Sequence, residues 1–243
     1  MKNYIQVAIA SLGFVIAAAL LGQAIKNRNK SQNTISVTGL GAKKFTSDLI
    51  TWSANFSKSN VDLKSAYDEL AADRKIISEY LKSKGLKDSE MVFSAVDIQK
   101  KFRSYNDANG NYVQGEFSGY NLTQSVFIES KEVAKIENLS RIITEIINQG
   151  VELTSSQPQY FYTKLAEVKQ EMIADATKDA KQRAEKIATN AGSSIGNLKK
   201  ASMGVIQITA PNSAEDYSWG GTYNTSSKEK EASITIKLEY EVD

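Results

Sequence analysis

Residues 50–57 read ITWSANFS, and apolar and polar side chains alternate along this stretch. The apolar members are Ile50, Trp52, Ala54 and Phe56. A period of two residues, rich in aromatic and β-branched side chains, predicts a half-buried strand. From residue 61 to residue 84 the apolar spacing becomes that of a helix. This change of period between neighbouring segments is typical of a fold that mixes strands and helices.

Three main helices are expected in the body of the chain. The first, over 61–84, has Asn60 as its predicted N-cap and Gly85 as its left-handed stop. The other two cover 131–149 and 164–190, and Gly150 and Gly192 follow them.

The remaining periodic segments alternate with a period of two and predict strands. They are residues 34–40, 91–103, 120–129, 198–209 and 232–242, with a further extended stretch at 151–162. On the 91–103 strand we expect Val92 and Val96 to face inward. The strands follow one another without regular β-α-β alternation, so the sequence predicts an α+β fold in which antiparallel sheets pack with the helices.

The N-terminus is a separate region. No charged residue occurs over 4–25, and 22 helical residues reach about 33 Å, enough to cross a hydrocarbon core. We therefore expect one transmembrane helix, with residues 5–25 in the membrane. A cleaved signal is the alternative, because Gly22-Gln23-Ala24 has the spacing of a cleavage site. The chain then divides into 1–30, an anchor or signal segment with a basic linker, and 31–243, the folded domain.

Charge and composition exclude several classes of function. Four of the 30 basic residues and none of the 28 acidic residues lie in 1–30, so the rest of the chain has a net charge of −2. A nucleic-acid partner is not expected for such a body. The chain has no His and no Cys, which excludes a Ser-His-Asp triad, His-based metal sites and thiolate chemistry. With no catalytic motif in view, we expect a protein that is not an enzyme and that carries no cofactor or metal.

Three segments are candidates for contacts. Small residues recur four apart in the 164–190 helix, and the members of this ridge are Ala176, Ala180, Ala184 and Ala188. The ridge fits either a seam between subunits or, as we favour, packing on the domain's own sheet. The loop at 211–227 carries Tyr217, Trp219 and Tyr223, and loops of this length are uncommon unless functional or mobile. Its aromatics suit a subunit interface or stacking on a sugar or peptide, and the alternative is that they lie on the domain's own surface.

The polar connection at 104–119 partly matches a calcium-binding loop. Asp107, Asn109, Gly110 and Glu116 stand at four of its positions, but Tyr105 occupies the first, where an Asp ligand is expected. Because strands flank this connection, a simple hairpin turn is predicted instead.

Four motifs occur in order along the body: ISVTGLG (35–41), GYNLTQSVFI (119–128), EMIADATKDAKQRAEKIATNAGSSIG (171–196) and ITIKLEYEV (234–242). Together they make the chain resemble the SIMPL-domain family, formerly a domain of unknown function, over residues 33–243. The resemblance implies an exported α+β domain of the bacterial periplasm or outer membrane with no established enzyme chemistry. Some members of the family assemble into large ring-like homo-oligomers.

We therefore expect a non-enzymatic interaction or structural protein that is anchored in the inner membrane, faces the periplasm and self-assembles in the bacterial envelope. The positive-inside rule, which sets Lys26, Arg28 and Lys30 against Lys2, favours a cytoplasmic body instead, so export rests on the resemblance. One alternative is an envelope module that binds glycan or peptide through the 211–227 loop. Another is a cleaved form that is soluble in the periplasm.

Overall fold

The computed structural model describes residues 12–24 and 33–242. Residues 12–24 are helical, and the remainder of the expected 5–25 membrane segment lies outside the described residues. Within the described ranges, none of the helices combines the length and the hydropathy needed to cross a bilayer.

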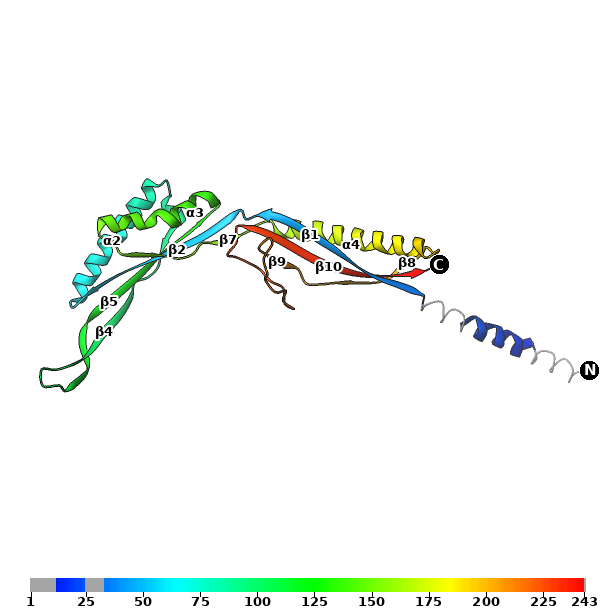
Figure 1. Ribbon diagram of the computed structural model, residues 1–243, viewed down its shortest axis with the longest axis horizontal. Coiled ribbons are helices and arrows are strands. Elements are labelled where there is room, and N and C mark those ends of the chain that lie inside the picture. Colours follow the sequence, from blue (N-terminus) through cyan, green and yellow to red (C-terminus); the bar gives the residue numbers. More distant parts are fainter. Residues whose placement is uncertain (1–11, 25–32, 243) are drawn as a thin grey trace, which may run out of the picture.

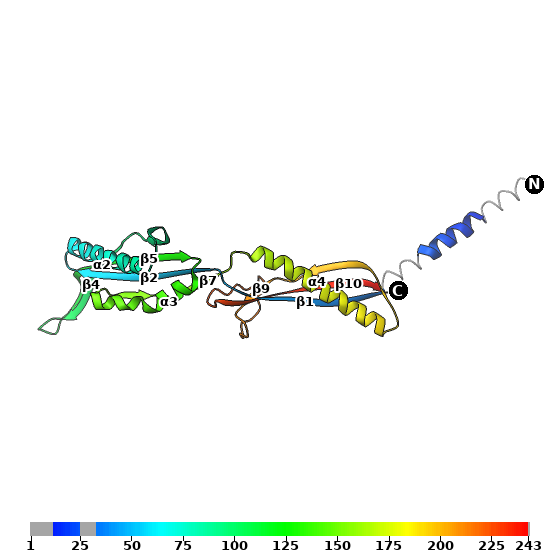
Figure 2. The same cartoon turned by 90° about the horizontal axis from the view of Figure 1, so that it is seen from above.

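The body is elongated, with two lobes arranged end to end (Figures 1 and 2). We call residues 49–161 the insertion lobe, because they lie in the chain between two parts of the other lobe, the terminal lobe. The terminal lobe contains β1 (Thr34–Thr46), α4 (Leu165–Asn190), β8 (Ile195–Met203), β9 (Gln207–Thr209) and β10 (Glu229–Val242). The insertion lobe contains β2 (Leu49–Asn60), α2 (Leu63–Ser83), η1 (Asp88–Glu90), β3 (Met91–Phe93), β4 (Asp97–Asn106), β5 (Tyr112–Ser130), α3 (Val133–Ile142), η2 (Ile143–Gln149), β6 (Leu153–Ser155) and β7 (Gln159–Phe161).

Each lobe is an antiparallel sheet with helices on one face. The terminal sheet has the order β1-β10-β8, and β9 also pairs with β10. The insertion sheet has the order β3-β5-β2-β6, with β4 on β5 and β7 on β2. The predicted α+β class with antiparallel sheets is confirmed. In Figure 1 the helices of both lobes lie on the same side of the molecule, so each sheet keeps a face without a helix.

The terminal lobe has a core of small residues on α4. The four alanines of the ridge are buried against β1 and β10. The approach is close because β1 has glycines there: a methyl group at Gly39 would lie 2.1 Å from the carbonyl oxygen of Ala176, and one at Gly41 would lie 2.2 Å from that of Met172. The ridge thus packs on the sheet of its own lobe, where it contacts the Gly39-Leu40-Gly41 segment of β1.

The insertion lobe has a core of large side chains. β2 and β5 turn their apolar residues toward α2, α3 and η2. The largest buried side chains of the strands and helices in this core include Phe56, Leu70, Ile77, Leu122, Ile128, Ile136 and Ile146. Trp52, buried in this core, donates from Nε1 to Ser155 Oγ at 3.0 Å. Gly150 ends η2 with φ of 80°, which is the left-handed stop that the sequence predicts.

The structure corrects four details of the sequence prediction. The N-cap of α2 is Asp62, whose side chain accepts a hydrogen bond from Ser65 N, while Asn60 still belongs to β2. The segment 91–103 is not one strand, because residues 94–96, between β3 and β4, lie opposite only two residues of β5 and interrupt the regular pairing. Val92 is 61% exposed, since Met91 is the residue of β3 that faces the core. The segment 198–209 is likewise interrupted at 204–206, between β8 and β9.

A short neck joins the lobes at Ser47 and Asp48. The Asp48 carboxylate accepts hydrogen bonds from Thr163 N and Thr163 Oγ1, both at 2.7 Å, and so ties the two crossings of the chain together. A salt bridge of 3.2 Å between Lys228 and Glu137 also links the lobes.

Candidate functional site

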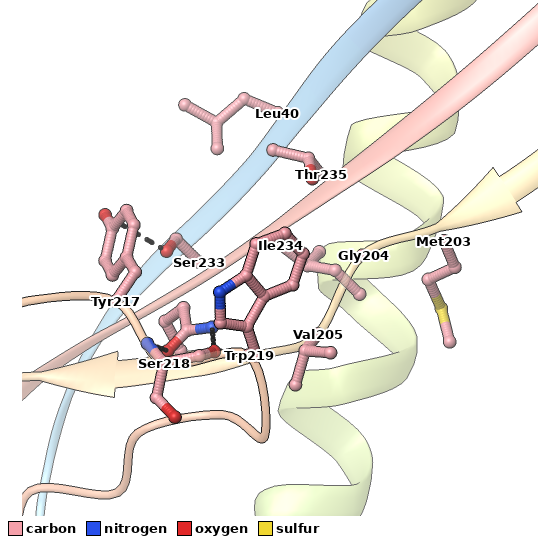
Figure 3. Close-up of a pocket in the computed structure, with 11 residues that line it drawn as sticks. Leu40, Met203, Gly204, Val205, Tyr217, Ser218, Trp219, Ser233, Ile234 and Thr235 are labelled. Atoms are coloured by element: carbon pink, nitrogen blue, oxygen red, sulfur yellow. Dashed lines mark hydrogen bonds between the residues drawn. The ribbon is translucent and has the colours of Figure 1, made fainter.

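An open apolar groove of about 620 Å³ lies on the uncovered face of the terminal sheet (Figure 3). Its floor is formed by the side chains of Leu40 on β1 and of Ser233 and Thr235 on β10. Met203 and Val205 lie at the end of β8 and just beyond it, and Tyr217 and Trp219 stand on the 211–227 loop. We call this the Trp219 groove. Its volume lies in the range of sites that hold a small molecule or a few side chains.

Trp219 and Tyr217 are the most exposed aromatic side chains of the groove. Trp219 is 99% exposed and Tyr217 is 70% exposed, while Leu40, Met203 and Val205 are each about half exposed. Together they form a contiguous apolar surface, and surfaces of this kind often mark binding sites.

The loop that carries Trp219 is fixed by the buried side chain of Gln207. Gln207 Nε2 donates to the carbonyl of Ser218 at 2.8 Å, and Gln207 Oε1 accepts from Thr222 N at 2.9 Å and Ser218 N at 3.3 Å. Three backbone groups on either side of Trp219 are thus held by one amide. Because the loop is already ordered, a partner would not have to immobilise it on binding.

A second buried polar residue, Lys230, holds the C-terminal part of the loop. Its side chain is fully buried, and Nζ donates to the carbonyls of Asn224 and, at 2.7 Å, Ser227. Nζ also lies 5.7 Å from the centre of the Tyr223 ring. Burial lowers the pKa of Lys230 from 10.5 to about 8, because the charged form loses its hydration.

The structure brings together two of the three predicted loop residues. Tyr217 and Trp219 share the groove, whereas Tyr223 lies toward the neck, where its hydroxyl accepts from Tyr162 N at 3.4 Å. The predicted ridge of Ala176, Ala180, Ala184 and Ala188 lies in the core, away from the groove. At 104–119 the chain forms a β4–β5 hairpin, in which the Asp107 carboxylate accepts from Asn109 N and Asn111 N, both at 2.9 Å.

Gln207, Lys230, Leu40 and Met203 were not predicted as parts of this site. Lys230 stands where β10 alternates inward, and a polar residue at an inward position is the one signal in the sequence that could have indicated it. Gln207 gives no such signal, because it pairs with Ser233 on the face of the sheet opposite the core. Leu40 and Met203 give no local signal, because only the pairing of β10 with both β1 and β8 brings them to one face.

Comparison with known proteins identifies the family of this chain. No curated protein matches the chain. The family model of SIMPL, described as a protein of unknown function (DUF541), matches residues 35–242, which is nearly the whole body and includes every residue of the groove. The chain therefore belongs to the SIMPL (DUF541) family.

Proposed function

We propose that this protein is a non-enzymatic interaction protein of the bacterial envelope, anchored in the inner membrane through residues 5–25, with its body in the periplasm. In this proposal it self-associates through the surface around the Trp219 groove. The observation that carries the proposal is a 99% exposed tryptophan on a loop that Gln207 fixes beside an apolar groove. Tryptophan is enriched among the residues that dominate binding energy at protein interfaces.

The shape of the body supports this role. β1 and β2, of 13 and 12 residues, follow one another along the long axis and at about 3.3 Å per residue span about 80 Å. The chain enters the body at Thr34, at the end of the molecule opposite the β4–β5 hairpin (Figure 1). An anchor at this end would keep neighbouring bodies on one membrane at high local concentration and so favour weak contacts between them.

The test of self-association is the mass of the full-length protein in detergent. We expect an assembly larger than one subunit by light scattering, and a marked fall in mass for Trp219→Ala. Phe127→Ala is the matched control, because Phe127 is a half-exposed aromatic on the sheet of the other lobe. A single-subunit mass for the unaltered protein would contradict the proposal, and so would a mass that Trp219→Ala leaves unchanged.

The anchor and its orientation need a separate test. Alkaline phosphatase fused to the C-terminus is active only after export, so we expect an active, membrane-bound fusion in intact cells. An inactive fusion would contradict the periplasmic location, and an active fusion in the soluble fraction would indicate a cleaved segment.

A second candidate function is binding of an envelope glycan or peptide in the same groove. Tyr217 and Trp219 offer rings for stacking, and the floor supplies the hydroxyl groups of Ser233 and Thr235. Retention on peptidoglycan that is lost in Trp219→Ala would support this candidate. The self-association proposal expects no retention.

A further inference from the structure

The β4–β5 hairpin is a second exposed apolar surface, and it lies at the far end of the insertion lobe (Figure 1). All residues of β4 are exposed. Phe102 packs edge-on against Phe117 with ring centres 6.1 Å apart, and Phe117 against Tyr120 at 5.2 Å. Phe102 is nevertheless 60% exposed and Phe117 43% exposed, so the aromatic cluster remains largely open to solvent.

The hairpin has a fixed, convex form. Arg103 pairs with Glu116 across the strands at 2.9 Å, and its guanidinium lies 5.0 Å from the centre of the Tyr105 ring. At the tip, the Asp107 carboxylate holds the turn through Asn109 N and Asn111 N. A convex surface of this kind has the shape that a concave groove accepts.

The charges at the two surfaces are complementary. Lys100 and Lys101 lie on β4, and neither forms a salt bridge with any other residue in 12–24 or 33–242. Glu215 and Asp216 precede Tyr217 on the groove loop, and the described part of the chain supplies no salt bridge to either of them. The mixed contact would set Lys100 and Lys101 of the hairpin against Glu215 and Asp216 of the groove loop.

We propose that the β4–β5 hairpin of one copy docks in the Trp219 groove of a second copy. The inference rests on the proposed self-association and names its geometry: a heterologous contact, in which every copy offers one hairpin and one groove. Such contacts join copies head to tail, and they close into a ring or continue as a filament.

The exposed aromatic area of the hairpin and the groove is large enough to form the centre of an interface. At about 200 Å² for an aromatic side chain, the exposed parts of Phe102, Tyr112 and Phe117 on the hairpin and of Tyr217 and Trp219 in the groove amount to on the order of 700 Å². A stable interface buries about 1,600 Å² in total, of which the fully buried apolar centre is only a part. The aromatic contact can therefore form that centre, with the charged residues at its rim.

Cysteine cross-linking tests this geometry, because the chain contains no cysteine. Met203→Cys places a thiol in the groove, and Gln114→Cys places one on the exposed hairpin. The two full-length variants are co-expressed with different tags, extracted in detergent and treated with a short bis-maleimide. Each variant expressed alone is the control, and its mass is measured in parallel.

The proposal expects a cross-linked dimer that carries both tags, and none in either variant alone. In a chain with both cysteines it expects a ladder of higher multiples. Adding Phe102→Ala and Phe117→Ala to the Gln114→Cys variant should lower the yield about tenfold or more, as expected for residues at the centre of an interface.

Three results would overturn it. A cross-link in one variant alone would show a like-with-like contact. An assembled mass without the mixed cross-link would reject the docking geometry and leave the proposed self-association standing. A single-subunit mass without any cross-link would reject both.

Discussion

The apolar cores of the two lobes are packed in opposite ways. In the terminal lobe, alanines on α4 meet glycines on β1, and the backbones approach so closely that a methyl group at Gly39 would lie 2.1 Å from a carbonyl oxygen. In the insertion lobe, residues such as Phe56 and Leu70 fill the space between a sheet and its helices. A contact between alanines and glycines tolerates no enlargement, whereas a contact between large side chains is weakened by truncation.

The largest effect on stability is expected from a larger side chain at the contact between β1 and α4. Gly39→Val would force β1 away from α4, and we expect a loss of more than about 4 kcal/mol in the free energy of unfolding, measured by urea titration with circular dichroism. Gly220→Ala is the matched control, because the nearest atom to the added methyl group lies 3.9 Å away. Equal stabilities for Gly39→Val and the unaltered protein would refute the close packing.

The second effect concerns truncation of the large side chains in the insertion core. Leu70→Ala should cost about 3 kcal/mol, because it leaves a cavity in the insertion core. Truncation in the terminal core, by Ala180→Gly, should cost only about 1 kcal/mol, mainly through lower helix propensity. If both truncations cost the same, the two cores do not differ in the way described.

The smallest effect concerns pH and is confined to the terminal lobe. The folded-state pKa of Lys230 is about 8 and its usual value is 10.5, so between these values the unfolded chain holds a proton that the folded chain has released. The free energy of unfolding should therefore rise with pH across this window, relative to a Lys230→Met variant. Below about pH 8 the lysine is protonated in both states, and the difference between the two proteins should be constant.

Urea titrations of both proteins at pH 7 and pH 10 measure this difference. The variant loses two hydrogen bonds to the loop at either pH, so that cost cancels in the comparison. Parallel pH dependences would mean that Lys230 is hydrated in the folded protein.

Local patterns predicted the elements whose neighbours in sequence decide them. The alternation of Ile234, Ile236, Leu238 and Tyr240 gave the correct buried face of β10, and Gly150 gave the correct end of η2. The interruptions of 91–103 and 198–209 were missed because each is an irregularity of strand pairing, in which residues 94–96 lie opposite two residues of β5 and residues 204–206 lie opposite two residues of β10. The same reason explains the groove: Tyr217 and Trp219 could be predicted from their loop, but its floor required the register between β1 and β10.

The most direct test of a contact at the groove is the fluorescence of Trp219. The chain has two tryptophans, and Trp52 is buried in the insertion lobe, so Trp52→Phe leaves Trp219 as the single reporter. In that variant, emission should be strongly red-shifted and open to acrylamide quenching at low concentration. As the concentration rises through assembly, we expect a blue shift and protection from the quencher. Assembly, measured by light scattering, that leaves the emission and quenching of Trp219 unchanged would contradict the account.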